Sequence, residues 1–178
     1  MRHRNYSIRA LCHGDVTRFQ EHFSRHRAES GRGDQHFLPF APDDREGPNL
    51  DVDALNRTLD EPGWQRWIIA IDDEENIVGH VDLKGDGLKT GRHRCELGIG
   101  IEREHRGKGL GRRLMETAVE FARDAGTLTW VDLRVFAHNA AARALYLDMG
   151  FSEVGTLVEG FRIEGQTVDD VIMTLKVG

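Results

Sequence analysis

The sequence has few cysteines and prolines, and it has no long apolar run. Cys12 and Cys95 are the only two cysteines in 178 residues, and neither stands in a C-x-x-C pair or in a zinc-ligand spacing. We therefore expect two reduced thiols, as in a cytoplasmic protein. The longest apolar runs, such as residues 68–71, fall far short of the roughly 20 residues of a membrane-spanning helix. The first residues lead into no apolar signal-peptide core, so we expect a cytoplasmic location and no membrane partner.

Basic residues are also in the minority. The chain has 24 lysines and arginines against 30 aspartates and glutamates, a net charge of -6. A general nucleic-acid binder needs a basic face, so we expect no nucleic-acid partner. An acidic surface suits a cationic ligand instead. The length and the balance of 39% hydrophobic and 30% charged residues predict one soluble globular domain over residues 1–178.

Apolar periodicity and turn residues predict alternating strands and helices. We expect strands over about 6–11, 67–71, 77–83, 95–101 and 130–136, two more within 154–177, and helices over about 15–30, 51–60, 110–125 and 139–149. Residues 31–49 are rich in glycine and proline and predict a long loop, which in a compact domain is usually functional or disordered. A single mixed sheet with helices on both faces is the economical architecture.

A glycine-rich segment, residues 106–112, separates the strand at 95–101 from the next helix. Glycines let the backbone approach a ligand closely, and the unpaired N–H groups of a helix start favour a phosphate. A Cβ at Gly109 or Gly111 is therefore expected to occupy phosphate space. The segment matches neither G-x-x-x-x-G-K-[ST] nor G-x-G-x-x-G, which disfavours a nucleotide hydrolase or a dehydrogenase.

Two sequence blocks carry a family resemblance. Residues 106–111, Arg-Gly-Lys-Gly-Leu-Gly, are similar to the motif [Q/R]-x-x-G-x-[G/A], and residues 139–146, followed by Gly150 and Phe151, are similar to N-x-x-A-x-x-x-Y…G-F. Both motifs, in this order, are typical of the Gcn5-related N-acetyltransferase (GNAT) superfamily, which the chain resembles closely over residues 65–178. The N-terminal third resembles it only in its strand–helix pattern.

The resemblance implies a fold and a cosubstrate. The fold is α/β, with a mixed, mostly antiparallel central sheet of about seven strands and about four helices on both faces. Residues 1–64 would form a variable N-terminal part of the single N-acetyltransferase domain. Residues 65–178 would form the acetyl-CoA-binding core and the closing hairpin.

The resemblance also assigns cofactor-binding residues. Main-chain groups around the glycines would hold the pyrophosphate of acetyl-CoA, and the strand edge before them would pair with pantetheine like an added strand. Asn139 would hydrogen-bond the pantetheine arm, or it would only cap its helix. The positions implied are Ile99, Gly100, Ile101, Arg106, Gly107, Lys108, Gly109, Leu110, Gly111, Arg112 and Asn139.

Two residues are candidates for proton transfer. Tyr146 matches the family tyrosine that protonates the departing CoA thiolate, and the alternative is an aromatic residue that only packs on its helix face. Glu96 matches a strand glutamate that deprotonates the amine through water in related enzymes, and the alternative is a charged residue paired to Arg94 or Arg92. Ribosomal-protein N-terminal acetylases carry a glutamate where this chain has Arg134, which argues against a protein N-terminus as substrate.

The sequence therefore predicts an acetyl-CoA-dependent N-acetyltransferase that moves an acetyl group to a primary amine of a small molecule by direct attack. An amino acid, a polyamine or an antibiotic-like amine is the expected acceptor, and residues 31–49 with the closing hairpin are expected to select it. The alternatives are a protein N-terminal or lysine acetyltransferase and a non-catalytic CoA-binding regulatory module.

His22 and His26 are four residues apart but no third ligand is evident, so no metal is expected. A homodimer is a further expectation.

Overall fold

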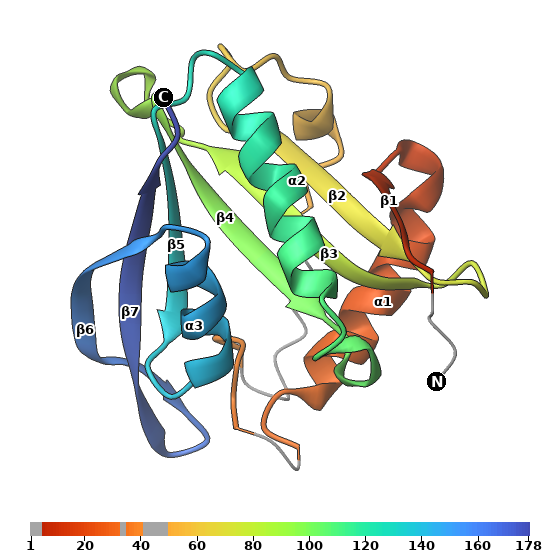
Figure 1. Ribbon diagram of the computed structural model, residues 1–178, viewed down its shortest axis with the longest axis vertical. Coiled ribbons are helices and arrows are strands. Elements are labelled where there is room, and N and C mark those ends of the chain that lie inside the picture. Colours follow the sequence, from red (N-terminus) through yellow and green to blue (C-terminus); the bar gives the residue numbers. More distant parts are fainter. Residues whose placement is uncertain (1–4, 33–34, 41–49) are drawn as a thin grey trace.

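Seven strands form one sheet in the computed structural model, which describes residues 5–32, 35–40 and 50–178 (Figure 1). The sheet order is β1-β2-β3-β4-β5-β7-β6. The strands are β1 (Ser7–Ala10), β2 (Gln65–Ile71), β3 (Ile77–Gly85), β4 (Arg94–Ile101), β5 (Trp130–Phe136), β6 (Ser152–Ile163) and β7 (Gln166–Lys176). The helices are α1 (Val16–Glu29), α2 (Leu110–Asp124) and α3 (Ala140–Asp148).

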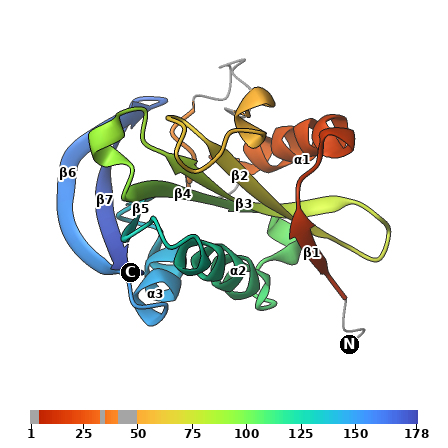
Figure 2. The ribbon, with the colours of Figure 1, turned by 90° about the horizontal axis from the view of Figure 1, so that it is seen from above.

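The helices cover both faces of the sheet. Helix α1 lies on one face, and α2 and α3 lie on the other (Figure 2). All neighbouring strands are antiparallel except β4 and β5, which run parallel. The parallel pair is connected through α2, as a parallel connection requires.

The main core lies between the sheet and α2. Leu110, Leu114, Ala118 and Ala122 follow each other at four-residue spacing and are each at most 1% exposed. This stripe faces the sheet because residues at i and i+4 share one side of a helix. Burial of a leucine-sized side chain stabilises the fold by roughly 1.5–3 kcal/mol. On the sheet, the same core contains Val81, Leu97 and Leu133.

A second, aromatic core lies beneath α1. Phe19 and Phe23 of the helix pack with Trp67 and Ile69 of β2, and the Phe19 and Trp67 rings meet edge to face with centroids 4.9 Å apart. Helix α1 is thereby held over β2 and β3. The neighbouring stretch of sheet, over β4 and β5, is left for the site described below.

The predicted mixed, seven-stranded α/β fold is confirmed, but three α-helices occur in the described part of the chain instead of about four. The helix expected over 51–60 is only a 3₁₀ turn, Asp53–Leu55. Local side chains satisfy the backbone there: Asp51 accepts from the N–H of Asp53, and Glu61 accepts from the N–H of Thr58. Such contacts compete with a regular helix. Most of the expected loop at 31–49 lies outside the described residues.

None of the described helices is both long and apolar enough to cross a bilayer.

Candidate active site

Strands β4 and β5 separate at one end, which opens the sheet. Residues 94–97 of β4 pair with residues 130–133 of β5, although β4 runs on to Ile101 and is paired with β3 from Cys95 to Ile101. Beyond Leu97 the other edge of β4 is therefore not paired with β5. An extended ligand can add to such an edge through main-chain hydrogen bonds. The predicted pantetheine-binding positions 99–101 line this opening.

The glycine-rich segment at 106–112 follows β4 directly and forms a cradle. Gly107 and Gly109 have φ angles of 68° and 78°, a left-handed conformation that favours glycine. A Cβ at either position would meet no atom within 4 Å. The backbone N–H groups of residues 107–112 have no backbone acceptor elsewhere in the described part of the chain. Free N–H groups before open space, at the positive end of α2, fit a pyrophosphate.

Gly111 differs from the other two glycines of the cradle. A Cβ there would lie 3.3 Å from Ile101 Cδ1 and 3.3 Å from Leu145 Cδ2. The missing side chain therefore lets α2 pack closely on β4 and α3. The expectation that a Cβ at Gly111 would occupy phosphate space is wrong, because a larger residue would disturb this packing instead.

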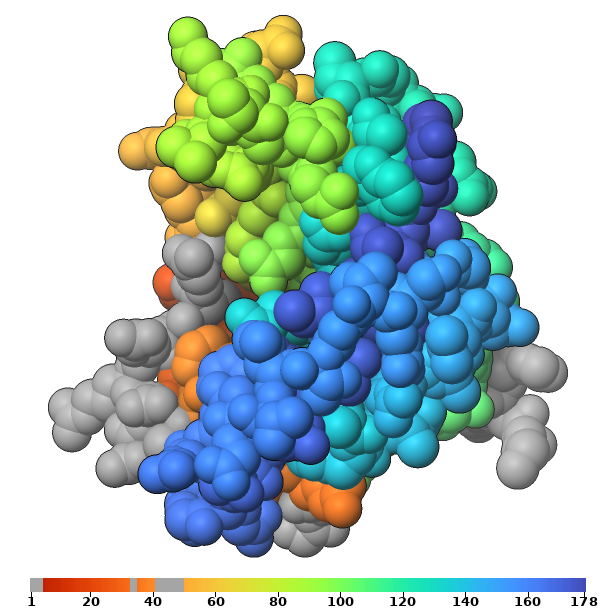
Figure 3. Space-filling model, turned by 90° about the vertical axis from the view of Figure 1, so that its left-hand side faces the viewer, coloured from red at the N-terminus to blue at the C-terminus, as the bar shows by residue number. Residues whose placement is uncertain are grey.

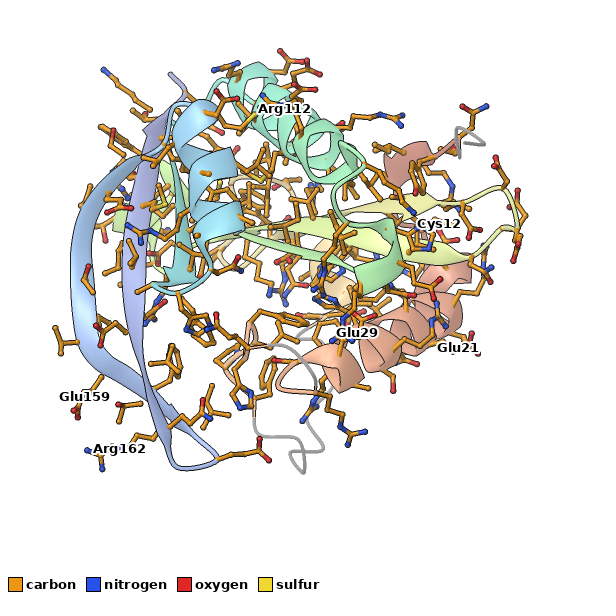
Figure 4. The ribbon with its side chains drawn as sticks, turned by 60° about the horizontal axis from the view of Figure 1, so that its bottom comes forward. Cys12, Glu21, Glu29, Arg112, Glu159 and Arg162 are labelled. Carbon is orange, nitrogen blue, oxygen red and sulfur yellow. The ribbon has the colours of Figure 1, made fainter. Side chains whose placement is uncertain are left out.

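The Arg106 side chain ties the start of the cradle to neighbouring elements. Its Nε donates to the carbonyl oxygen of Ile101 (2.8 Å), and its Nη2 donates to Glu29 Oε2 (2.9 Å). Its guanidinium also lies over the Phe37 ring, 4.6 Å from the centroid. Figure 4 shows Glu29 near the end of α1, beside the turn that leads into α2. Arg106 thus connects α1 to the end of β4, and its side chain is engaged with the protein.

Two further cations surround the cradle. Lys108 Nζ donates to the carbonyl oxygen of Glu104, and Arg112 pairs with Asp148 of α3. Both side chains are exposed, and Figure 4 shows Arg112 on α2. Their charges add to the positive potential of the helix start, which favours an anionic ligand.

Helix α3 carries the two other predicted residues. Asn139 Oδ1 accepts from the N–H of Ala142 (3.2 Å) and caps the helix, so its contact with pantetheine stays a prediction. Tyr146 is 6% exposed, and its ring packs 6.1 Å from that of Phe151. Burial raises the pKa of the Tyr146 phenol. The group therefore keeps its proton at neutral pH, as a proton donor must.

Glu96 points to the opposite face of the sheet, the face that α1 partly covers. Glu96 forms an ion pair with neither Arg92 nor Arg94, although a purely structural role would require one. Arg94 instead binds Asp132, with Nε 2.7 Å from Oδ2. The Glu96 side chain is exposed and makes no ion pair within the described residues. Its carboxylate is therefore free to receive a cation.

An open pocket of about 710 Å³ surrounds Glu96. Figure 3 looks onto this side of the molecule, where the loop after β3 and the β6–β7 hairpin flank a hollow. The pocket offers charges of both signs, because both basic and acidic side chains line it. Its lining includes Lys84, Arg94, Glu96, Asp132, Arg134 and Leu157.

Two residues of β3, Asp82 and His80, complete this face and were not predicted. A Cβ at Gly98 would lie 2.7 Å from Asp82 Oδ1, and a Cβ at Gly100 would lie 2.5 Å from His80 Cε1. Both side chains are nearly buried, at 5% and 4% exposure. Two glycines at i and i+2 of one strand mark a close approach on one face. This was the available signal, but it does not identify the partners.

A chain of hydrogen bonds joins α1 to β3 and to the end of β4. His22 Nδ1 lies 2.7 Å from Glu102 Oε1, and His22 Nε2 lies 2.9 Å from His80 Nδ1. The His26 ring stacks on that of His22 at 6.1 Å. Burial lowers the pKa of His80 well below its usual value and that of His26 to about 3. No group of three or more side chains suited to a metal occurs in the ranges that the structure describes.

The sequence and the fold are similar to those of known acetyltransferases. The model of the acetyltransferase (GNAT) family matches residues 31–151. A spermidine N(1)-acetyltransferase from Vibrio cholerae serotype O1 is 30% identical over 149 residues, which cover 78% of this chain and 84% of that protein. An N-alpha-acetyltransferase RimI from Mycobacterium tuberculosis is 37% identical over 113 residues, 63% of this chain and 67% of that protein. A crystal structure of a GNAT-family acetyltransferase from Streptococcus pneumoniae is 26% identical and matches with a TM-score of 0.84, over 97% of this chain and 100% of the other.

The chain therefore belongs to the acetyltransferase (GNAT) family. It is an N-acetyltransferase, as the two sequence blocks predicted, and this favours an enzyme over the non-catalytic alternative. The roles of individual site residues, the cytoplasmic location, the single domain and the homodimer stay predictions.

Proposed function

We propose that this protein transfers the acetyl group of acetyl-CoA to the primary amine of a small molecule that also carries an acidic group, such as an α-amino acid. The observation that carries the proposal is the mixed charge of the pocket around Glu96. Three cationic side chains and three acidic ones line it, namely Lys84, Arg94, Arg134, Asp86, Glu96 and Asp132. A zwitterion complements such a lining better than an ion of a single sign does.

The spare hydrogen-bond donors of Arg134 support an acceptor that carries an acidic group. Arg94 and Arg134 each already hold a carboxylate, Asp132 and Asp170. Of the acids that line the pocket, Glu96 and Asp86 make no ion pair within the described residues, so either can receive an ammonium group. A polyamine could bind through these carboxylates, but it has no acidic group for the arginines of the pocket. Arginine has five N–H donors, so Arg134 can bind a substrate carboxylate while it remains paired with Asp170. Arg134 follows Leu133, the last residue of β5 that pairs with β4, and so lies at the mouth of the opening.

The cradle is the part of the chain that would hold the cosubstrate. Its N–H groups at 107–112 would bind the pyrophosphate, and the free edge of β4 at 99–101 would bind pantetheine. Acetyl-CoA supplies an acetyl group that is already activated as a thioester. The protein has to orient the amine, remove its proton and hold a proton at the Tyr146 hydroxyl for the departing thiolate.

The peptide N-terminus is a second candidate acceptor, favoured by the 37% identity to the RimI protein. Arg134 argues against it, as the sequence also suggested. A peptide N-terminus has no nearby α-carboxylate for this arginine to bind.

Thiol release from acetyl-CoA in the presence of an amine panel tests the proposal. The panel contains L-amino acids, the carboxamides of the same amino acids, spermidine and a short peptide. We expect kcat/KM to be at least roughly tenfold higher for the acids than for their carboxamides, because a charge-assisted hydrogen bond contributes about 1.5–3 kcal/mol. Equal values for acid and carboxamide would contradict the acidic group. A preference for spermidine or the peptide would identify one of the rival acceptors.

A further inference from the structure

Asp82 lies where β4 and β5 separate. Leu97 is the last residue of β4 that pairs with β5, so Gly98 is the first residue beside the opening. Asp82 is the partner of Gly98 in the β3–β4 ladder. Its Oδ1 lies so close to Gly98 that a Cβ there would be 2.7 Å away. The carboxyl group therefore leans over the Gly98 backbone, on the face that also carries Glu96.

The surroundings of Asp82 differ from those of Glu96. Asp82 is 5% exposed, and burial raises the pKa of its carboxyl group. Lys84, whose Nζ lies 3.2 Å from Asp82 Oδ2, lowers this pKa, and the charge of Glu96 raises it. Trp67 faces Asp82 from β2 without a charge, and His80 is kept neutral by burial. A carboxyl group with a raised pKa is the better general base near neutral pH.

We propose that Asp82 is a catalytic residue that takes the proton from the acceptor ammonium, and that Glu96 binds this ammonium as it enters. The inference rests on the proposed function. One N–H bond of the ammonium breaks and one O–H bond forms on Asp82, so the amine nitrogen regains its lone pair. After the product leaves, Asp82 releases the proton to water and is again a carboxylate.

The positions of the two carboxylates support this division. Glu96 stands in the part of β4 that is still paired with β5, opposite Asp132, in the exposed pocket. Asp82 stands one step further along the same face, over the first unpaired residue. An amine that passes from the pocket toward the opening meets Glu96 first and Asp82 second.

Steady-state kinetics over a range of pH test the assignment, with the best amine of the panel. Asp82→Asn keeps the shape of the side chain but removes the base, so we expect kcat to fall about 100-fold or more and the acid limb of the pH profile to change. Glu96→Gln should instead raise KM for the amine roughly tenfold with a smaller change in kcat. Asp73→Asn, on the exposed β2–β3 turn, is the matched control and should behave as wild type.

Lys84→Met provides a second test that does not remove the carboxyl group. Without the Lys84 charge, the pKa of Asp82 should rise, and the acid limb of kcat/KM should move to higher pH. Methionine retains much of the packing of Lys84 on the Trp67 ring, which lies 5.1 Å from Nζ. A folded Asp82→Asn variant with the wild-type kcat and acid limb overturns the proposal. So does an unmoved acid limb in Lys84→Met.

The same assay distinguishes a failure of the proposed function from a failure of the role of Asp82. If the wild-type enzyme releases no thiol with any amine, the proposed function fails and the role of Asp82 fails with it. If the wild-type enzyme is active and only the Asp82 and Lys84 variants give contrary results, the acceptor class stands and Asp82 is a structural residue.

Discussion

Acid should destabilise the folded protein through its buried histidines before it protonates most carboxylates. Burial lowers the pKa of His26 from 6.5 to about 3. As the pH falls, His26 is therefore protonated in the unfolded chain before it is protonated in the folded protein. Neutral His26 contributes its full stabilisation above pH 6.5, and this contribution is lost progressively between pH 6.5 and pH 3.

At moderate pH, the loss of stability depends only on the pKa of His26 in the unfolded chain. At pH 5 the folded state still keeps His26 neutral, while the unfolded state is protonated about 30 to 1. The free energy of unfolding should therefore fall by about 2 kcal/mol for this residue, since one pKa unit corresponds to about 1.36 kcal/mol. His80, whose pKa also lies well below 6.5, adds to the loss in the wild-type protein.

Urea unfolding at pH 7.5 and pH 5.0 measures this difference. In His26→Leu the loss of stability between the two pH values should be smaller than in wild type by about 2 kcal/mol, whatever the stability of the variant at pH 7.5. His93→Gln changes an exposed histidine and should leave the difference at the wild-type value. An equal loss in wild type and His26→Leu would refute a neutral, buried His26.

Two further predictions concern the cosubstrate and its leaving group. Gly109→Ala should weaken acetyl-CoA binding, measured by calorimetry, roughly tenfold or more, because the methyl group enters the space before the free N–H groups. Gly126→Ala imposes the same left-handed strain with equally open space at the other end of α2, so equal affinities of the two variants would contradict the cradle. Tyr146→Phe should lower kcat and kcat/KM together by about 100-fold while the Kd of acetyl-CoA stays unchanged. A wild-type rate with chemistry rate-limiting would make Tyr146 a packing residue.

The parts of the site that were predictable from sequence depend on local backbone geometry. The left-handed turns at Gly107 and Gly109 lead directly into α2, and the Asn139 cap lies within its own helix start. Such features need only neighbouring residues, so motif and spacing reveal them. The missing helix at 51–60 shows the limit of this reasoning. There the side chains of Asp51 and Glu61 bind backbone N–H groups in place of a regular helix. The spacing of apolar residues gives no sign of such side-chain contacts.

The face of β4 that carries Glu96 and contacts Asp82 and His80 could not be predicted, because these contacts depend on the register between strands. Asp82 meets Gly98, and His80 meets Gly100, only because β3 and β4 pair with this register. A slip of one residue would turn every side chain of β3 to the other face. The long turn between the two strands, residues 86–93, does not define a register by its length. The chemical partners of the two glycines therefore become visible only in the folded sheet.

Gly98 and Gly100 of β4 leave one face of the strand open to side chains of β3. With side chains at positions 98 and 100, β4 would keep Asp82 and His80 away from its backbone, since a Cβ there would come within 2.7 Å of both side chains. Without them, one face of β4 receives polar groups from β3, while its free edge remains available to an extended ligand. The same short segment can thus present an acetyl donor at its edge and an acceptor amine at its face. This arrangement explains why the carboxyl group that we propose as the base belongs to β3 and not to the strand that carries the motif.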